Sequence, residues 1–249
     1  MTSIFNNDRL PLSNEEISKC RSLELRTNSL YENVYGLDEV NICTYIGNTT
    51  YCAISLDYSK SFSSLIRDSK QLTKEQLEKA YWELMDDKIK DIGIGFATVH
   101  DYDTLGSRMA QTKGRREAIK NCTKHVDVLF CDYYVGNFMK ETFTYKAVRG
   151  DEKFLCVSGA SIIAKHISNK IMEELDKDFP EYNLKNNHGC FGGSTKNAII
   201  KYGFIPGLCR KSWCSKFYNG TKFCKSVNEM TYIKRVLERE KIYESIRNR

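Results

Sequence analysis

The chain lacks any apolar run that approaches the roughly 20 residues needed to cross a bilayer. Its 249 residues are 41% hydrophobic and 28% charged, a composition typical of soluble globular proteins. The opening MTSIFNNDRLPLSNEEISKC has neither a basic start nor an apolar core, which argues against a secretory signal. We therefore expect a cytoplasmic protein without a membrane span.

The chain also lacks a CxxC pair, although it contains ten cysteines. Disulfides are typical of small secreted domains, so a longer chain without a signal is expected to keep its thiols reduced. A zinc site built from His188, Cys190, Cys209, Cys214 and Cys224 is an alternative, but structural zinc sites usually contain closely spaced cysteine pairs. Scattered reduced thiols are the better interpretation.

Internal repeats, low-complexity tracts and long linkers are absent too, so the length indicates one domain with terminal additions. The net charge of +6 suits a polyanionic partner without proving one. The basic residues gather at 112–116, at Lys196 with Lys201, and at 209–217. Each patch taken alone is more typical of a solvated face.

What is present is an alternation of strand and helix patterns, which favours a mixed sheet flanked by helices. Thr73 and Gln76 form a capping-box pattern, and Leu72 with Leu77 a hydrophobic staple, at the start of one helix. The patterns predict strands over 34–40, 49–57 (after a turn at Gly47-Asn48), 91–100, 126–132 and 142–149, and helices over 14–27, from 73, 103–120, 158–179, 195–202 and about 226–247.

Four acids stand out by position. Asp38 and Glu39 follow an apolar strand, Asp132 ends VLFCD, and Asp151 follows the next strand-like segment. Carboxylates at strand ends can converge in space, where they would repel one another and favour a divalent cation. Oxygen-only ligands select Mg²⁺ or Mn²⁺, and two such ions are a common device for displacement at phosphate. For any one acid, an ordinary strand-end or turn position is the alternative.

The longest predicted helix carries a polar stripe. Ser158, Ser161, Lys165 and Asn169 fall at i, i+3, i+7 and i+11, which places them along one face. With Asp151 just upstream, this helix start and its hydroxyls suit a phosphate backbone. A merely solvated face explains the stripe equally well.

These blocks, in this order, resemble the type 2 ribonuclease H family (ribonuclease HII) over residues 33–217. The resemblance rests on Asp38-Glu39 with the later Gly47, on RDSKQL at 67–72, on Asp132, on Arg149-Gly150-Asp151, on SGASIIAK at 158–165, on 188–195 followed by Lys201-Tyr202-Gly203, and on Arg210-Lys211-Ser212-Trp213.

The resemblance implies an α/β, ribonuclease H-like catalytic domain over 33–217, with an N-terminal extension over 1–32 and a C-terminal helical tail over 218–249. It implies an endonuclease that hydrolyses the RNA strand of RNA/DNA hybrids, or cuts 5′ of ribonucleotides in duplex DNA, leaving a 3′-hydroxyl and a 5′-phosphate. Asp38, Glu39, Asp132 and Asp151 carry over as catalytic ligands of two Mg²⁺ or Mn²⁺ ions, with Asp38 between them. A monomer is the default expectation.

The resemblance also implies residues that bind nucleic acid. Lys165, Ser158 and Ser161 would line the phosphate path, and Lys70, Arg210 and Lys211 would contact the backbone. Asn41, Ile42 and Cys43 replace the family's GRG, whose backbone approaches the 2′-hydroxyl, and Phe191 replaces a tyrosine that lies against sugar or base. Cys190, Cys209 and Asn169 are further departures, so reading of a single ribonucleotide is the property most exposed to change.

A protein of a different class is the alternative: a paralogue that binds hybrids without cleaving them, using the same basic face. Four intact carboxylates argue against it, because a pure binder gains nothing from anions beside phosphates.

Overall fold

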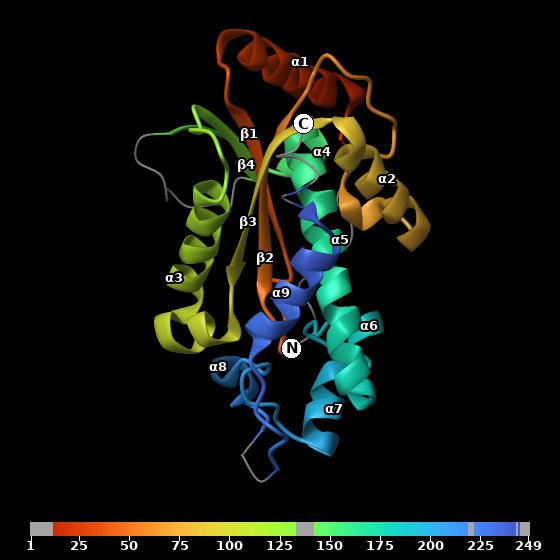
Figure 1. Ribbon diagram of the computed structural model, residues 1–249, viewed down its shortest axis with the longest axis vertical. Coiled ribbons are helices and arrows are strands. Elements are labelled where there is room, and N and C mark those ends of the chain that lie inside the picture. Colours follow the sequence, from red (N-terminus) through yellow and green to blue (C-terminus); the bar gives the residue numbers. More distant parts are fainter. Residues whose placement is uncertain (1–11, 133–141, 219–221, 243, 245–249) are drawn as a thin grey trace.

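The computed structural model describes residues 12–132, 142–218, 222–242 and 244 (Figure 1). Its sheet has five strands in the order β3-β2-β1-β4-β5. β2 pairs antiparallel with β1 and β3, whereas β4 pairs parallel with β1 and β5, so the predicted mixed sheet is confirmed. The strands are β1 (Val34–Val40), β2 (Thr49–Leu56), β3 (Ile89–Ala97), β4 (Val128–Asp132) and β5 (Phe143–Ala147).

Helices cover both faces of this sheet, α3 on one side and α5 on the other (Figure 1). The α-helices are α1 (Asn14–Leu30), α2 (Lys74–Asp87), α3 (Val99–Lys120), α4 (Gly150–Lys153), α5 (Leu155–Asp178), α6 (Leu184–Asn187), α7 (Gly193–Tyr202), α8 (Lys211–Cys214) and α9 (Glu229–Arg239); short 3₁₀ turns are η1 (Ser69–Gln71) and η2 (Pro180–Tyr182). Among the described helices, none is long and apolar enough to cross a membrane.

The alternation of side chains along the strands divides the core in two. On β2, Cys52 and Ile54 join the cluster beneath α5, while Tyr51 and Ala53 join the cluster beneath α3. α5 can run directly over β1 because Gly36 has no side chain: a Cβ there would lie 2.2 Å from the carbonyl carbon of Cys156. This close approach holds the start of α5 beside the strand that carries two of the predicted acids.

Local sequence signals set most element boundaries. The capping box of Thr73 and Gln76 begins α2 as predicted. α3 begins four residues before its predicted start, because Thr98 and Asp101 form a second capping box, and Gly106 (φ 76°) kinks the helix. The connection between β1 and β2 is longer than a two-residue turn, and Gly47 takes φ 89° near its end. The predicted helix over about 226–247 is confirmed for 229–239, and its last residues lie outside the described part.

Candidate active site

Parallel pairing of β1 and β4 brings acids from both strands to one edge of the sheet. Leu37 lies opposite Cys131 in the last pair of this register, so the pair is followed by Asp38 within β1 and by Asp132 at the end of β4. Because successive side chains alternate between faces, neighbouring Asp38 and Glu39 reach different layers. Asp38 meets Ser161 of α5, and Glu39 meets Arg115 of α3.

Asp151 reaches the same edge from α4. The helix starts hard against the end of β4, where a Cβ on Gly150 would lie 3.0 Å from the carbonyl oxygen of Cys131. Asp151 is buried, and its carboxylate lies 2.9 Å from the ammonium of Lys70. Lys70 also lies 3.9 Å from Asp68, so this lysine, predicted to contact nucleic acid, is here a counter-charge to the acids.

The neighbouring acids raise one another's pKa values. Burial raises the pKa of Asp38, and the charges of Glu39 and Asp151 raise it further, against the opposing effects of Ser161 and Lys70. Burial also raises the pKa of Glu39; Arg115, at 3.4 Å, opposes this rise and Asp132 adds to it. The surroundings of Asp38 and Glu39 therefore oppose their negative charge, and this condition favours a bound cation.

The donor chemistry of the four acids fits a hard divalent ion, since every donor is a carboxylate oxygen. Within the described residues, however, no group of three or more His, Cys, Asp or Glu side chains is placed to hold a metal ion. The split of Asp38 and Glu39 between two layers, and the Lys70 ammonium against Asp151, account for this spacing. The four carboxylates are thus suitable metal ligands that lie near one another, but in this structure they are not arranged around a single ion position.

The polar stripe on α5 divides into buried and accessible parts. Ser158 is fully buried, and its hydroxyl donates to the carbonyls of Asp151 and Phe154 at 2.7 and 2.9 Å. Its burial contradicts a place on the phosphate path; the side chain instead ties α5 to α4. Ser161 is also buried and contacts Asp38, and the half-buried Lys165 donates to the Ser69 carbonyl at 2.9 Å, so both lie at the acidic edge but only Lys165 is accessible there.

The segment Asn41–Cys43 directly follows the end of β1, two residues after Glu39. Cys43 is exposed, and its carbonyl accepts a 3.1 Å hydrogen bond from the amide of Phe191. The Phe191 ring is 45% exposed and packs 4.5 Å from the ring of Tyr45 and 4.7 Å from that of Trp213. Phe191 thus presents an aromatic face beside this segment.

The two basic residues of the CRKSW segment have opposite surroundings. Lys211 is exposed, as a backbone contact would require. Arg210 is completely buried, which contradicts the prediction that it contacts the nucleic-acid backbone. Its guanidinium faces the carbonyls of the segment after β1, because α8 begins directly behind that segment.

Sequence reasoning missed Arg115 and Asp68. Arg115 lies in the basic patch at 112–116, which was interpreted as solvated, yet it is buried and pairs with Glu39 while its guanidinium lies 5.4 Å from the centre of the Tyr51 ring. Asp68 is buried and accepts the Lys70 amide at 2.9 Å, where it caps η1. An Asp directly before Ser-Lys is a capping signal that could have placed Asp68; no local signal distinguishes Arg115 from Arg116.

Comparisons with known proteins show which proteins the chain is similar to. A ribonuclease HII of Acetivibrio thermocellus is 31% identical over 75% of this chain and 72% of its own length. Ribonuclease H2 from Pyrococcus horikoshii OT3, 22% identical, superposes with a TM-score of 0.61 over 82% of this chain and 98% of its own. Bst-RNase HIII in complex with Mn²⁺ is 15% identical and superposes with a TM-score of 0.59 over 95% of this chain and 77% of its own.

The likeness to these solved structures confirms the expected ribonuclease H-like fold. The model of the family described as ribonuclease HII matches residues 35–216, a range that includes all four acids. The chain therefore belongs to the ribonuclease HII family of ribonuclease H endonucleases.

Proposed function

We propose that this protein is a metal-dependent endoribonuclease that hydrolyses the RNA strand of RNA/DNA hybrids or cuts 5′ of ribonucleotides embedded in duplex DNA. Cleavage would leave a 3′-hydroxyl and a 5′-phosphate. The observation that carries the proposal is the meeting of Asp38, Glu39, Asp132 and Asp151, from three separate elements, at one edge of the sheet. A protein that only bound hybrids would gain nothing from carboxylates gathered beside phosphates.

The four carboxylates would hold two Mg²⁺ or Mn²⁺ ions, which supply a lowered pKa for the attacking water and a counter-charge for the leaving 3′-oxygen. Two residues of this chain fix the positions of carboxylates that would bind the ions. Arg115 holds Glu39 on the α3 side, and Ser161 holds Asp38 on the α5 side. Such fixed carboxylates keep substrate and ligands aligned and lower the entropy cost of reaching the transition state.

The duplex would lie along the accessible residues around this edge. Lys165 and the exposed Lys211 supply positive charge for phosphates, and Phe191 supplies a ring for a sugar or base. Lys70 is exposed along much of its side chain, so it can exchange its pairing with Asp151 for a phosphate. Ser158 and Arg210, which are buried, are left out of this surface.

The first test uses two labelled duplexes, a long RNA/DNA hybrid and a DNA duplex with a single ribonucleotide, each in Mg²⁺ and in Mn²⁺. We expect metal-dependent cleavage of the hybrid, abolished by EDTA. Replacement Asp132→Asn should lower kcat by about 10³-fold or more, because a metal position supplies several kcal/mol of transition-state stabilisation. Binding of the uncleaved duplex should persist in the variant.

The outcomes separate the candidate functions. Cleavage of both duplexes would mean that Asn41–Cys43 still reads a lone ribose, whereas cleavage of the hybrid alone would mean that this reading has been lost. Binding of hybrids without cleavage in either metal would establish the non-catalytic paralogue in place of the enzyme. Size-exclusion chromatography with light scattering of the same samples tests the proposed monomer.

A further inference from the structure

Arg210 is the largest fully buried side chain of the described residues, and its guanidinium serves one segment. Nε donates to the carbonyl of Gly47 at 3.0 Å, Nη1 to that of Ile42 at 2.6 Å, and Nη2 to that of Asn41 at 2.9 Å. Nη2 also donates to the Thr49 hydroxyl at 3.2 Å. One planar group thus gathers three carbonyls from the connection between β1 and β2.

Two aromatic rings hold this guanidinium in place. Its central carbon lies 3.8 Å from the centre of the Tyr102 ring and 4.8 Å from that of Trp213. Stacking of this kind restricts the plane of the group and stabilises a cation removed from water. The backbone amide of Arg210 adds a fifth hydrogen bond, at 2.8 Å to the Tyr45 carbonyl of this connection.

The direction of these carbonyls fixes the direction of the amides. In a trans peptide the C=O and the following N–H point to opposite sides, and the described chain contains no cis peptide bond. Because the carbonyls of Asn41 and Ile42 face Arg210, the N–H groups of Ile42 and Cys43 face away from it. Neither N–H has a hydrogen-bond partner in the described part of the chain.

Asn41 supplies the backbone bend that this arrangement needs. Its φ of 65° is left-handed, a conformation that asparagine tolerates better than most residues other than glycine. Its side-chain amide donates to the Ser168 hydroxyl of α5 at 2.6 Å, which fixes the bend against the helix. The segment therefore keeps a defined backbone without the glycines that its relatives' pattern would lead one to expect.

We infer that Arg210 is a positioning residue, which from behind the Asn41–Cys43 segment holds the amides of Ile42 and Cys43 as two fixed donors for an oxygen of the substrate's sugar-phosphate backbone. The inference rests on the proposed function, because it places the donors next to the proposed reacting phosphate. Arg210 itself touches no substrate. A lysine cannot replace it, since a single ammonium cannot reach three carbonyls that a planar fork reaches at once.

The test compares Arg210→Met with Lys211→Met, which removes the neighbouring exposed charge. Hydrogen exchange of the 41–48 peptide, measured by mass spectrometry, reports the segment directly and needs no cleavage. Salt dependence of hybrid binding, measured in the Asp132→Asn background, reports phosphate contacts, since each lost contact lowers the slope of log K against log salt by about 0.9. Cleavage rates, measured with Asp132 intact, report how well the substrate is positioned.

We expect Arg210→Met to speed exchange over 41–48, to leave the salt slope unchanged, and to lower kcat by about 10- to 100-fold, the scale of a displaced substrate contact. Lys211→Met should lower the salt slope and leave the exchange as it is. The inference is overturned if Arg210→Met lowers the slope by about 0.9 while exchange over 41–48 stays unchanged, because Arg210 would then bind phosphate itself.

A second pair of variants keeps the test decisive if Arg210→Met does not fold. Asn41→Ala strains the left-handed bend and should reproduce the faster exchange and the lower kcat. Asn41→Gly adopts this bend freely and loses only the side-chain hydrogen bond to Ser168, so it should change both values less than Asn41→Ala does. Equal values for both variants would contradict the inference. Failure of the parent protein to cleave any duplex would refute the proposed function alone. Hydrogen exchange and the salt slope of binding need no cleavage, so they would still test the positioning role of Arg210.

Discussion

Glu229 shows how one buried residue can set the pH dependence of stability. Its carboxylate accepts the Val99 amide at 2.9 Å, and its other oxygen has no hydrogen-bond partner among the described residues. Burial raises its pKa from 4.5 to about 7, against the opposing effects of the Val99 hydrogen bond and of Arg210. The folded state therefore holds this proton over a pH range in which the unfolded chain has released it.

The sign follows from the direction of that shift. A raised pKa stabilises the fold at low pH, and this contribution is lost as the pH rises from about 4.5 to about 7. Between pH 5.5 and pH 8 the loss is about 2 kcal/mol in the free energy of unfolding, at 1.36 kcal/mol per pKa unit. Glu229→Gln should remove this component, so urea unfolding at the two pH values should differ by that much less in the variant. A parallel pH profile for both proteins would show that Glu229 stays ionised.

At this scale the sequence predicted acids that lie close to one another in the structure, but it did not predict the orientation of the basic residues. Position alone did not single out the acids, because an acid at a strand end often has an ordinary structural role; the order of the blocks that resemble the family singled them out. Arg210 and Arg115 stand in basic patches that look solvated, and only the tertiary structure turns them inward. Local pattern gives no sign of this, because a buried arginine is stabilised by carbonyls and rings from distant segments.

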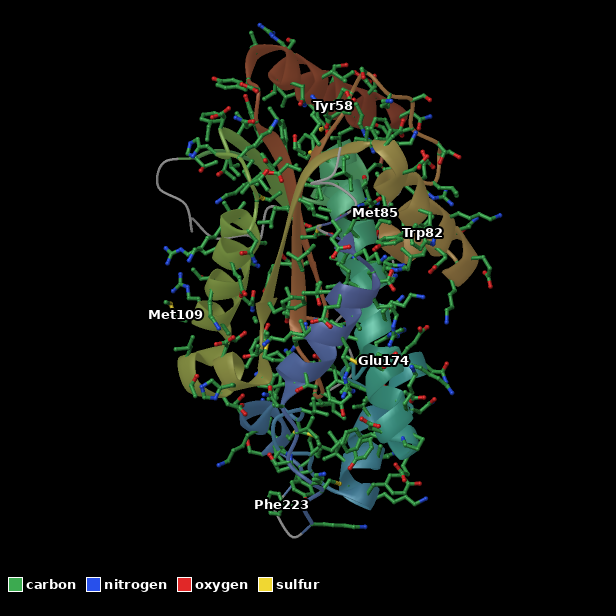
Figure 2. All side chains as sticks on the ribbon, in the orientation of Figure 1. Tyr58, Trp82, Met85, Met109, Glu174 and Phe223 are labelled. Carbon is green, nitrogen blue, oxygen red and sulfur yellow. The ribbon has the colours of Figure 1, made fainter. Side chains whose placement is uncertain are left out.

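Among the elements, α1 contributes more than its place before the first strand suggests. Phe154, the residue that precedes α5, provides no side-chain cap for this helix. Glu24 of α1 fills that place: it is buried and accepts the amides of Leu155 and Cys156, both at 2.7 Å. Tyr58 donates to the same carboxylate, and Figure 2 shows it beside α1. A carboxylate at this end also interacts favourably with the helix dipole.

We therefore expect Glu24→Gln to destabilise the protein by about 2 kcal/mol, since an amide has one acceptor oxygen where the carboxylate uses two, and hydrogen bonds to charged groups contribute about 1.5–3 kcal/mol. Glu15→Gln is the matched control on the same helix. Glu15 is exposed and pairs only with Lys19 at 2.6 Å, so its loss should cost less than about 0.5 kcal/mol. Equal midpoints of urea unfolding for the two variants would show that Glu24 does not cap α5.

Element types were predictable where the signal is local, as with the capping box of α2 and the apolar alternation of β1 and β2. The cap of α5 was not, because it comes from a residue 131 positions earlier in the chain. The start of α3 was missed for a simpler reason: the Thr98 to Asp101 capping box was present but was included in the preceding strand.

For the whole molecule, the boundary expected at residue 217 is the feature most open to revision. α9 lies across α5 (Figure 1), with Tyr232, Ile233 and Val236 buried beneath it. Arg239 pairs with Glu174 at 2.5 Å, and Figure 2 shows Glu174 beside α9. Interhelical contacts of this kind make α9 part of the same core as the sheet, and we propose that the folded unit extends beyond 217.

Ending the chain after Phe217 tests this proposal. The truncated protein loses the burial of Tyr232, Ile233 and Val236, each contributing about 1.5–3 kcal/mol, and exposes the matching apolar surface of α5. A loss of roughly 5 kcal/mol is comparable with the whole stability of a domain, about 5–15 kcal/mol. We expect the truncated chain to be largely insoluble, or to melt at a markedly lower temperature without a single cooperative transition. If it instead melts at the temperature of the full chain, α9 is an appended tail and the ribonuclease H-like domain ends where the sequence pattern placed it.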